Sequence, residues 1–326
     1  MTSHRKRNPG RKAVALVVVV AIAAWVAILT FGGADAPRPQ SASAAGADAS
    51  PVEVGVAHPA ESFPTLDGSK PIFILVLGSG ARPPTPPEHG LADSIHIVSY
   101  NPQLQTGSIL GIPRDSWVPI PGHGSNKINA AMGWGGTSLM ITTVENLTGI
   151  HINFFMVTGF SGFENFINAL PRIKFVAPYD MHDPYSKADV KKGSNYINGH
   201  GALGVTRDRH DVPNGDFSRS SNGGLMLLAI LTQFKKQFNQ DPSRFLTYLG
   251  AGLGNVKTDI PYDQLVTLAL TSRFVNPKSV VNIVAAGSIG NESGLSTVDL
   301  SSSNKKIYDD MKDDGVISKH AKGAPV

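Results

Sequence analysis

The sequence predicts an α/β layered fold preceded by one transmembrane helix. An uncharged apolar segment lies close to the amino terminus. Farther along, short continuous apolar runs bounded by Gly and Pro are typical of strands buried on both faces. These runs alternate with segments whose apolar residues recur at helical spacing, a pattern that indicates strands and helices packed in layers.

The amino-terminal apolar segment, residues 13–31, is 19 residues long and contains no charged residue. That length is close to the ~20 residues that a helix needs to cross a bilayer, and it exceeds the roughly 7–15 apolar residues of a cleavable signal peptide. Residues 1–12 carry five basic side chains and no acidic one, so we expect a cytoplasmic amino terminus and an extracytoplasmic main domain. Ala34-Asp35-Ala36 is an A-x-A pattern, which leaves cleavage after Ala36 as the alternative.

Composition excludes several classes of protein. The net charge is +4, but residues 1–12 contribute +5, so the remaining chain sums to −1 and is not a basic surface for nucleic acid. The chain has no cysteine, which excludes disulfides, thiolate zinc sites and cysteine nucleophiles. It also lacks the P-loop, H-E-x-x-H and G-x-S-x-G motifs.

The composition along the chain predicts five segments. The stretch after the apolar segment is rich in Ala, Pro, Ser and Gly, which is typical of an extended linker, and the stretch after about 298 is polar and expected to fray. The predicted segments are a cytoplasmic basic tail (1–12), a transmembrane anchor (13–31), an extracytoplasmic linker (32–70), a folded domain (71–298) and a polar C-terminal tail (299–326).

Strands and helices are predicted in alternation within the folded domain. The apolar runs predict strands at 71–80, 94–100, 107–113, 151–159, 172–178 and 279–286. Helical spacing predicts helices at 160–170, 221–238 and 243–275. The 221–238 helix has an unusually wide apolar face, which indicates either an ordinary core helix or one wall of an apolar pocket.

Charged side chains stand at the ends of the first three predicted strands. In chain order they are Arg82, Asp93, Arg114 and Asp115, and a Gly- and Pro-rich loop then leads to Lys127 and Asn129. Charges at such positions gather at one edge of an α/β sheet, which is where ligands usually bind.

More arginines follow near the predicted 221–238 helix. Arg207 and Arg209 form an R-x-R pair whose side chains share one face if the segment is extended, and Asp216 and Arg219 come next. Several arginines in a near-neutral domain predict an anionic partner, because guanidinium groups pair bidentately with phosphate and stay charged. An aspartate among them is suited to hold Mg²⁺.

Some of these residues also have ordinary structural interpretations. Asp216 is suited to cap a helix over 217–238. Lys127 is compatible with a solvated loop, and the R-x-R pair with a surface network through Asp208 and Asp211. Each residue alone is therefore weak evidence, and the set of arginines carries the prediction.

The motifs together resemble those of the LytR-CpsA-Psr family, the cell-wall glycopolymer ligases of Gram-positive bacteria. I-P-R-D, K-I-N-A, R-x-R and G-D-F-x-R occur in the family's order between about residues 72 and 235. The matching segments are ILVLGSGAR, ADSIHIVSYNPQ, GSILGIPRDSWVPIPG, KINAAMGWGG, TVENLTGIHINFFMVTGFSGFENFINALP, YINGHGALGVTRDRH and GDFSRS.

The resemblance implies a three-layer α/β/α sandwich with a central mixed sheet, outside the membrane and anchored to it. It implies a phosphotransferase that takes a glycopolymer from a polyprenyl-diphosphate carrier and attaches it to peptidoglycan. It further implies that Arg114 is the catalytic arginine, that Asp115 orients it, and that Asp93 binds Mg²⁺. The implied phosphate-binding residues are Arg82, Lys127, Asn129, Arg207, Arg209 and Arg219.

Two departures from the family pattern leave other functions open. Gly80 stands where the family has a metal-binding aspartate, and Ser220–Gly224 replaces a segment that begins Arg-Gln in the family. A non-catalytic protein that binds a polyprenyl-phosphate lipid or a wall glycan is the main alternative. Hydrolysis of the diphosphate, with water in place of the sugar hydroxyl, is a third.

Overall fold

A computed structural model describes residue 68 and residues 70–324. The predicted basic tail and anchor, and all of the predicted linker except residues 68 and 70, lie outside these described residues. None of the helices described is both long enough and apolar enough to span a membrane.

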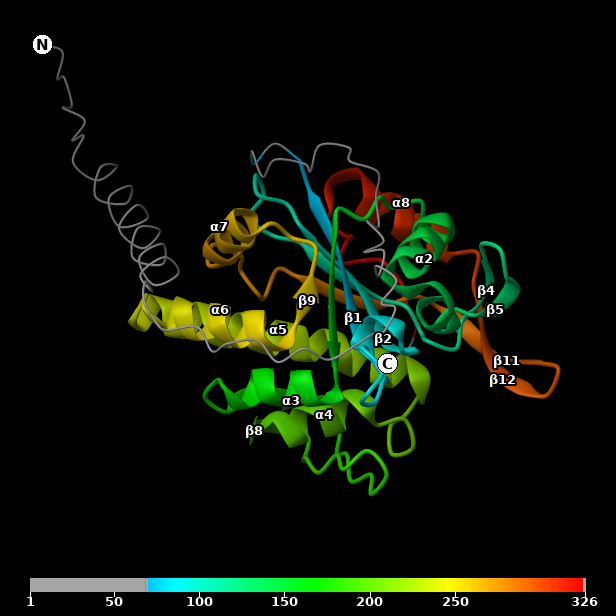
Figure 1. Ribbon diagram of the computed structural model, residues 1–326, viewed down its shortest axis with the longest axis horizontal. Helices are drawn as coiled ribbons and strands as arrows, with labels where there is room; N and C mark the ends of the chain where they lie inside the picture. The colour runs from blue at the N-terminus through cyan, green and yellow to red at the C-terminus, as the bar shows by residue number, and fades with distance from the viewer. Residues whose placement is uncertain (1–67, 69, 325–326) are drawn as a thin grey trace, which may run out of the picture. The chain divides into compact units, whose positions relative to one another are not determined.

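A six-stranded mixed sheet forms the centre of the described chain (Figure 1). Its strand order is β10-β3-β2-β1-β6-β9, where β1 is antiparallel to β2 and parallel to β6, and β3 is parallel to β10. The strands are β1 (Ile72–Ser79), β2 (Ala92–Tyr100), β3 (Ser108–Gly111), β6 (Phe154–Gly159), β9 (Lys257–Thr258) and β10 (Val281–Val284).

Helices cover both faces of this sheet, which explains why β1 is a continuous apolar run. One face, which includes Leu75 and Leu77, packs in a core with α2 (Ala130–Thr148) and α8 (Asn304–Asp314). The other face, which includes Ile74, packs toward α7 (Tyr262–Ser272). The α/β fold with a central mixed sheet is therefore confirmed.

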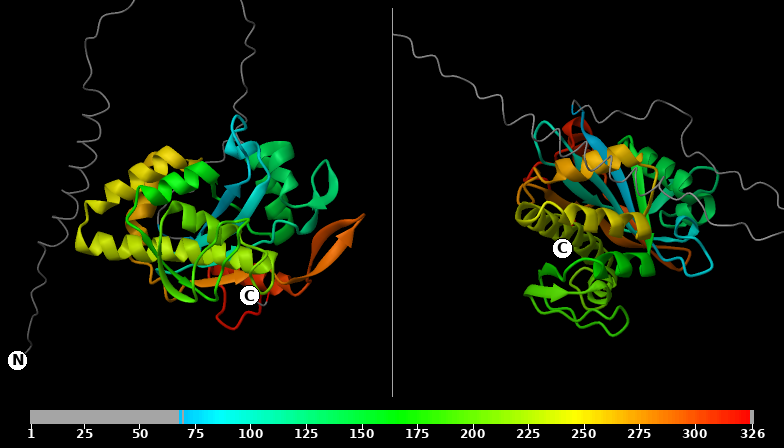
Figure 2. Two further views of the ribbon diagram at one scale, coloured as in Figure 1. Left: turned by 90° about the horizontal axis from the view of Figure 1, so that it is seen from below. Right: turned by 60° about the vertical axis from the view of Figure 1, so that its left-hand side comes forward.

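A further apolar core lies beyond the long helix α5 (Asp216–Gln240). Figures 1 and 2 show α3, α4 and β8 on the opposite side of α5 from the sheet. The elements that share this core with α5 are α3 (Phe160–Asn168), β7 (Ile173–Ala177), β8 (Gly193–Ile197), α4 (Gly199–Arg207) and α6 (Arg244–Asn255). Helix α5 thus lies between the sheet and this core.

Two hairpins and a short 3₁₀ helix complete the described fold. The hairpins are β4 (Trp117–Ile120) with β5 (Gly124–Lys127), and β11 (Gly287–Glu292) with β12 (Leu295–Leu300). The 3₁₀ helix η1 (Pro87–His89) lies in the loop between β1 and β2. The β4–β5 hairpin replaces the irregular loop expected before Lys127.

The predicted polar tail from residue 299 is wrong for the described residues 299–324. Tyr308 and Met311 on α8 are buried in the core beneath the sheet, together with Ile307 and Ile317. The charged residues of α8 lie on its other side, so a mostly polar sequence still supplies a buried apolar stripe. The predicted 243–275 helix is also corrected, because β9 divides it into α6 and α7.

Candidate active site

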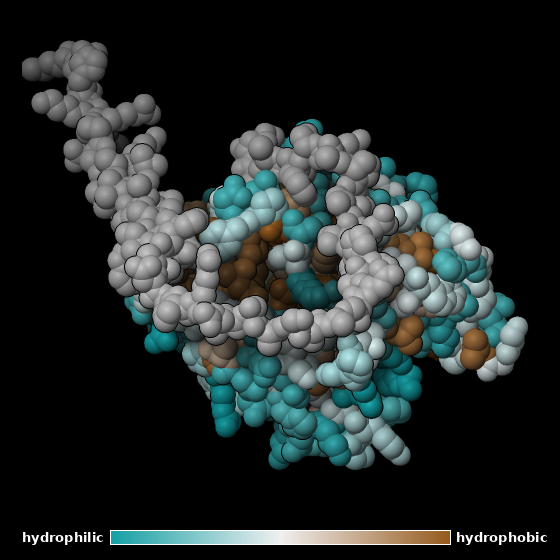
Figure 3. All heavy atoms as spheres, in the orientation of Figure 1, coloured by the Kyte–Doolittle hydropathy of each residue, from teal (hydrophilic) through white to brown (hydrophobic). Residues whose placement is uncertain are grey.

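A cavity of about 400 Å³ lies between the sheet and the core that contains α3 and α4. Its walls come from β1, β2, β6, α3, α4 and α5. Figure 3 shows a hollow with hydrophobic walls on this face of the molecule. The cavity therefore lies between the sheet and the helices that pack beyond it, a concave setting that is typical of ligand sites.

One end of the cavity is apolar. Three phenylalanines of α3, spaced three residues apart, share one helix face and line the cavity opposite apolar residues of α5. These residues are Phe160, Phe163 and Phe166 on α3, and Met226, Leu227 and Ile230 on α5. The wide apolar face predicted for the 221–238 helix is thus both core and cavity wall.

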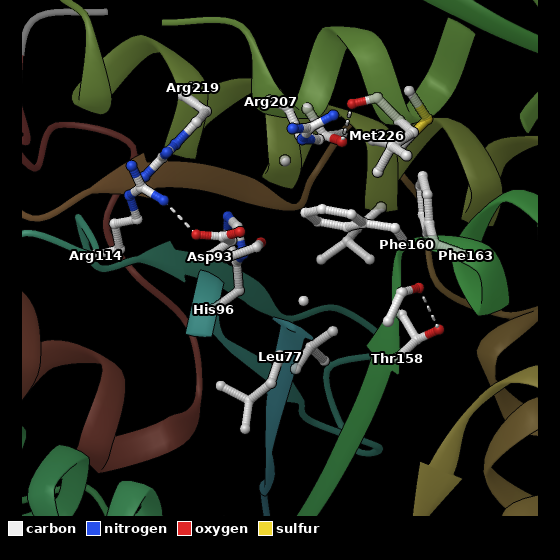
Figure 4. A pocket seen from close by; sticks show the side chains of 18 of the residues that line it. Leu77, Asp93, His96, Arg114, Thr158, Phe160, Phe163, Arg207, Arg219 and Met226 are labelled. Atoms are coloured by element: carbon white, nitrogen blue, oxygen red, sulfur yellow. Dashed lines mark hydrogen bonds and ion pairs between the residues drawn. The ribbon is translucent and has the colours of Figure 1, made fainter. Parts of the chain in front are cut away.

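Three charged residues lie together at the other end of the cavity, and two more arginines line the cavity elsewhere. Figure 4 shows Asp93, Arg114 and Arg219 together on the side of the cavity opposite Phe163 and Met226. Arg207 and Arg209 line the same cavity, and the Arg207 guanidinium lies 4.5 Å from the centre of the Phe160 ring. Five of the predicted site residues are therefore brought together: Asp93, Arg114, Arg207, Arg209 and Arg219.

Arg114 lies close to two carboxylates. It follows β3, and its guanidinium forms an ion pair with Asp93 at the start of β2. Asp115 lies 3.9 Å from its Nε atom and is in turn 3.1 Å from Lys127 Nζ. Burial alone would lower the pKa of Arg114, but the charges of Asp93 and Asp115 outweigh it and raise that pKa. Arg114 is therefore fixed in place as a permanent positive charge.

Arg219 is more deeply buried, with 7% of its side chain exposed. It lies in the first turn of α5 and forms an ion pair with Asp216, although neither Asp216 oxygen accepts a hydrogen bond from a described residue. Burial lowers the pKa of Arg219, Asp216 opposes that effect, and the neighbouring charge of Arg114 lowers it further. Two guanidinium groups close enough to repel each other favour an anion between them.

His96 is a cavity residue that the sequence interpretation missed. It is buried on β2, with Ser94 Oγ 3.1 Å from Nδ1 and the Ser220 carbonyl oxygen 2.8 Å from Nε2. Burial lowers its pKa, so the ring is neutral, and Nε2–H donates to the carbonyl. In the sequence, the only indication of a role for His96 was a single histidine within an apolar strand. That pattern is equally typical of a histidine buried in the core.

Four predicted site residues do not line the cavity. Arg82 is exposed in the loop after β1. Asp115 contacts the guanidinium group of Arg114, and Lys127 contacts Asp115. Asn129 is buried, and its backbone N–H donates to the Arg114 carbonyl at 3.2 Å. The latter three are thus placed to position Arg114.

Three local expectations are corrected. The R-x-R segment is not extended, because Arg207 is the last residue of α4, yet both arginines line the cavity. Asp216 does not cap α5, since Gly215 holds the N-cap position with φ +51° and the helix begins at Asp216 itself. In addition, Asp208 accepts backbone N–H groups rather than pairing with the arginines.

Asp93 is the cavity-lining carboxylate that contacts the catalytic-site arginine Arg114, and it is the residue placed to bind a metal ion there. In the described part of the chain, no group of three acidic or histidine side chains is arranged to hold a metal ion. A Cβ atom on Gly80 would lie 2.5 Å from Asp93 Oδ2, so Asp93 occupies space that a larger residue 80 would need. The residues present fit a Mg²⁺ ion only if most of its ligands come from phosphate oxygens and water.

The sequence pattern of the LytR_cpsA_psr family matches residues 41–313. The chain belongs to the LytR_cpsA_psr family. This confirms the resemblance inferred from the motifs, and the match covers the described fold from residue 68 to the next-to-last residue of α8.

A curated relative of this chain is named as a transferase. A Bacillus cereus protein named polyisoprenyl-teichoic acid–peptidoglycan teichoic acid transferase TagU is 30% identical over 201 residues, 61% of this chain. That match spans 64% of the relative's length, so the chain covers less than two thirds of it.

Solved structures show the same fold. The crystal structure of B. subtilis TagV is 26% identical, with a TM-score of 0.62 over 73% of this chain and 94% of that one. A LytR-CPS2A-psr family protein, YwtF (TagT), with bound octaprenyl pyrophosphate lipid is 22% identical, with a TM-score of 0.56 over 74% and 88% of the two chains.

Proposed function

We propose that this protein transfers a glycopolymer from a polyprenyl-diphosphate carrier to peptidoglycan. The observation that carries the proposal is the division of one cavity into an apolar end and an arginine-rich end. A lipid diphosphate has the same two parts, an apolar tail joined to a compact anion. Membership of the family and the transferase names of its relatives support the same assignment.

The geometry suits phosphoryl transfer by charge neutralisation. The tail would lie between α3 and α5, and the diphosphate would contact Arg114, Arg207 and Arg219. A hydroxyl of the acceptor glycan attacks the phosphorus that carries the glycopolymer, and polyprenyl phosphate leaves with the electron pair of the broken P–O bond. Such transfer depends on positive charge that is already in position. Arg114 would supply this charge without moving, because Asp93 and Asp115 hold its guanidinium group in place.

We propose Mg²⁺ as a cofactor that arrives with the diphosphate. Asp93 is the residue that would hold it, and the ion would neutralise charge on the phosphate oxygens. Because Asp93 also pairs with Arg114, binding the ion would compete with that pair.

A membrane location belongs to the same proposal. We propose that residues 13–31 anchor the chain in the cell membrane, with the amino terminus in the cytoplasm and the domain outside. The partners would then be a lipid-linked glycan, the membrane and peptidoglycan, and no nucleic acid.

The test is a product analysis. The full chain in detergent micelles is incubated with a polyprenyl-diphosphate oligosaccharide and peptidoglycan fragments, with Mg²⁺ or with EDTA, and products are followed by mass spectrometry. We expect a glycan-phosphate–peptidoglycan adduct that is lost in EDTA. Arg114→Ala should lower its rate by at least about 10²-fold, the usual effect of removing one positioned donor.

A matched control is Arg244→Ala, because Arg244 is half-exposed on α6 and pairs with Asp241 outside the cavity. Its adduct yield should equal that of the native chain. Lipid that binds without any product would support the non-catalytic binding protein instead. Free glycan phosphate in place of the adduct would support hydrolysis.

A further inference from the structure

Asp183 is a buried carboxylate that lines the cavity, and none of the ion pairs described for the arginines involves it. Its side chain is fully buried, and the backbone N–H groups of Tyr185 and Ser186 each donate to it at 3.0 Å. Burial opposes ionisation, but these donors prevail and lower the pKa of Asp183 to about 2. Asp183 is therefore a fixed negative charge that lines the same cavity as the arginines.

This carboxylate faces a histidine. His210 Nδ1 lies 3.4 Å from Asp183 Oδ2, and the two side chains come from loops far apart in sequence. A separation of this length shortens in many enzymes once substrate binds. An ionised carboxylate on that side favours the tautomer in which Nδ1 carries the hydrogen, which leaves Nε2 as a proton acceptor.

The position of His210 lets a ligand in the cavity reach its side chain. It follows Arg209 directly, lines the cavity with Arg207, and has 51% of its side chain exposed. A group that meets an incoming acceptor needs this access, whereas the buried His96 lacks it. The charged or titratable groups around His210 are Asp183, Tyr185, Asp208, Arg209 and Asp211.

We propose that His210 is the general base of the transfer, with Asp183 as its positioning residue. The inference rests on the proposed function. As the acceptor hydroxyl oxygen forms its bond to phosphorus, its proton passes to His210 Nε2. The bond from phosphorus to the bridging oxygen breaks, and its electron pair leaves with polyprenyl phosphate. The proton on Nε2 is then released to solvent.

If the His210–Asp183 pair had only a structural role, replacing His210 would have a different effect on activity. The His182–Asp189 pair provides a matched control for this alternative. His182 and Asp189 form a second histidine–carboxylate pair in the same loop region, with Nδ1 2.8 Å from Oδ1, but neither residue lines the cavity. If such pairs only fasten loops, loss of either histidine should have the same small effect on activity.

The experiment compares His210→Gln with His182→Gln in the adduct assay. We expect His210→Gln to lower kcat by about 10²–10⁴-fold, the usual contribution of a general base, with the Kd of the lipid diphosphate changed less than about twofold. The acidic limb of the kcat–pH profile should flatten, and imidazole should restore part of the activity of His210→Ala. His182→Gln should keep native kcat.

Thermal melting of each variant controls for folding, and His210→Asn serves as a second variant if His210→Gln unfolds. Native kcat and an unchanged pH profile in a folded His210 variant would overturn the proposal and leave the transferase function standing. Equal losses of kcat in the His210 and His182 variants would also overturn it. A native chain that binds the lipid but forms no adduct would overturn both proposals.

Discussion

Replacing Arg219 with glutamine should destabilise the protein strongly. Arg219 and Asp216 are each more than nine-tenths buried and form an ion pair in the first turn of α5. Removing one partner leaves the other as an uncompensated buried charge, which typically costs about 3–5 kcal/mol.

The structure points to the lower part of that range. Arg114 is close enough to disfavour the positive charge of Arg219, so its removal also relieves a repulsion. We therefore expect a loss of about 3 kcal/mol in the free energy of unfolding for Arg219→Gln, or on the order of 10²-fold in the folding constant.

Guanidinium-induced unfolding measures this loss of stability. The single variants Arg219→Gln and Asp216→Asn and the double variant together form a double-mutant cycle. The double variant should lose clearly less stability than the sum of the single variants, because it leaves no unpaired charge. Arg244→Ala, which breaks the half-exposed pair with Asp241, should change stability by less than about 1 kcal/mol. Additive losses in the cycle would refute the reasoning, since they would mean that the two residues do not act as a buried pair.

Three further outcomes test other parts of the molecule. Phe163→Asp should weaken polyprenyl-diphosphate binding by at least about tenfold but leave inorganic diphosphate binding unchanged in calorimetry, because the new charge lies at the apolar end. Met311→Ala should cost about 2–5 kcal/mol in unfolding, against less than about 0.5 for the exposed Lys305→Ala on the same helix, and equal losses would argue against a buried α8. The lowered pKa of Asp183 stabilises the native state above the ordinary Asp pKa of about 3.9, and this contribution is lost as pH falls toward about 2. Asp183→Asn should therefore flatten the stability curve over that pH range, and an unchanged slope would contradict the assignment.

The central strands could be predicted from the sequence because both faces of the sheet are covered. Leu75 and Leu77 serve one core and Ile74 another, so β1 had to be a continuous apolar run. Helix α2 could not be found in the same way. Gly135 and Gly136 break its helical geometry, and Gly136 adopts a φ of +66°, so the segment carries the signature of a loop.

The candidate site was predicted by residue type more successfully than by geometry. The arginines after β3 and around α4 and α5 do meet in one cavity, as ligand-binding charges in an α/β fold are expected to. Sequence spacing could not show that Lys127 contacts Asp115 rather than the cavity, because that contact is made across the β4–β5 hairpin. Nor could it pair His210 with Asp183, since the two residues are 27 positions apart.

Helix α5 contributes to both ends of the cavity, with Arg219 in its first turn and Ile230 three turns later. At a rise of 1.5 Å per residue these positions are about 17 Å apart along one straight element. Because both positions belong to one helix, the distance between them is fixed. Under the proposed function, a diphosphate near Arg219 and a lipid tail near Ile230 would therefore be held at a spacing that one helix sets, so the distance between the two parts of the site does not depend on any loop.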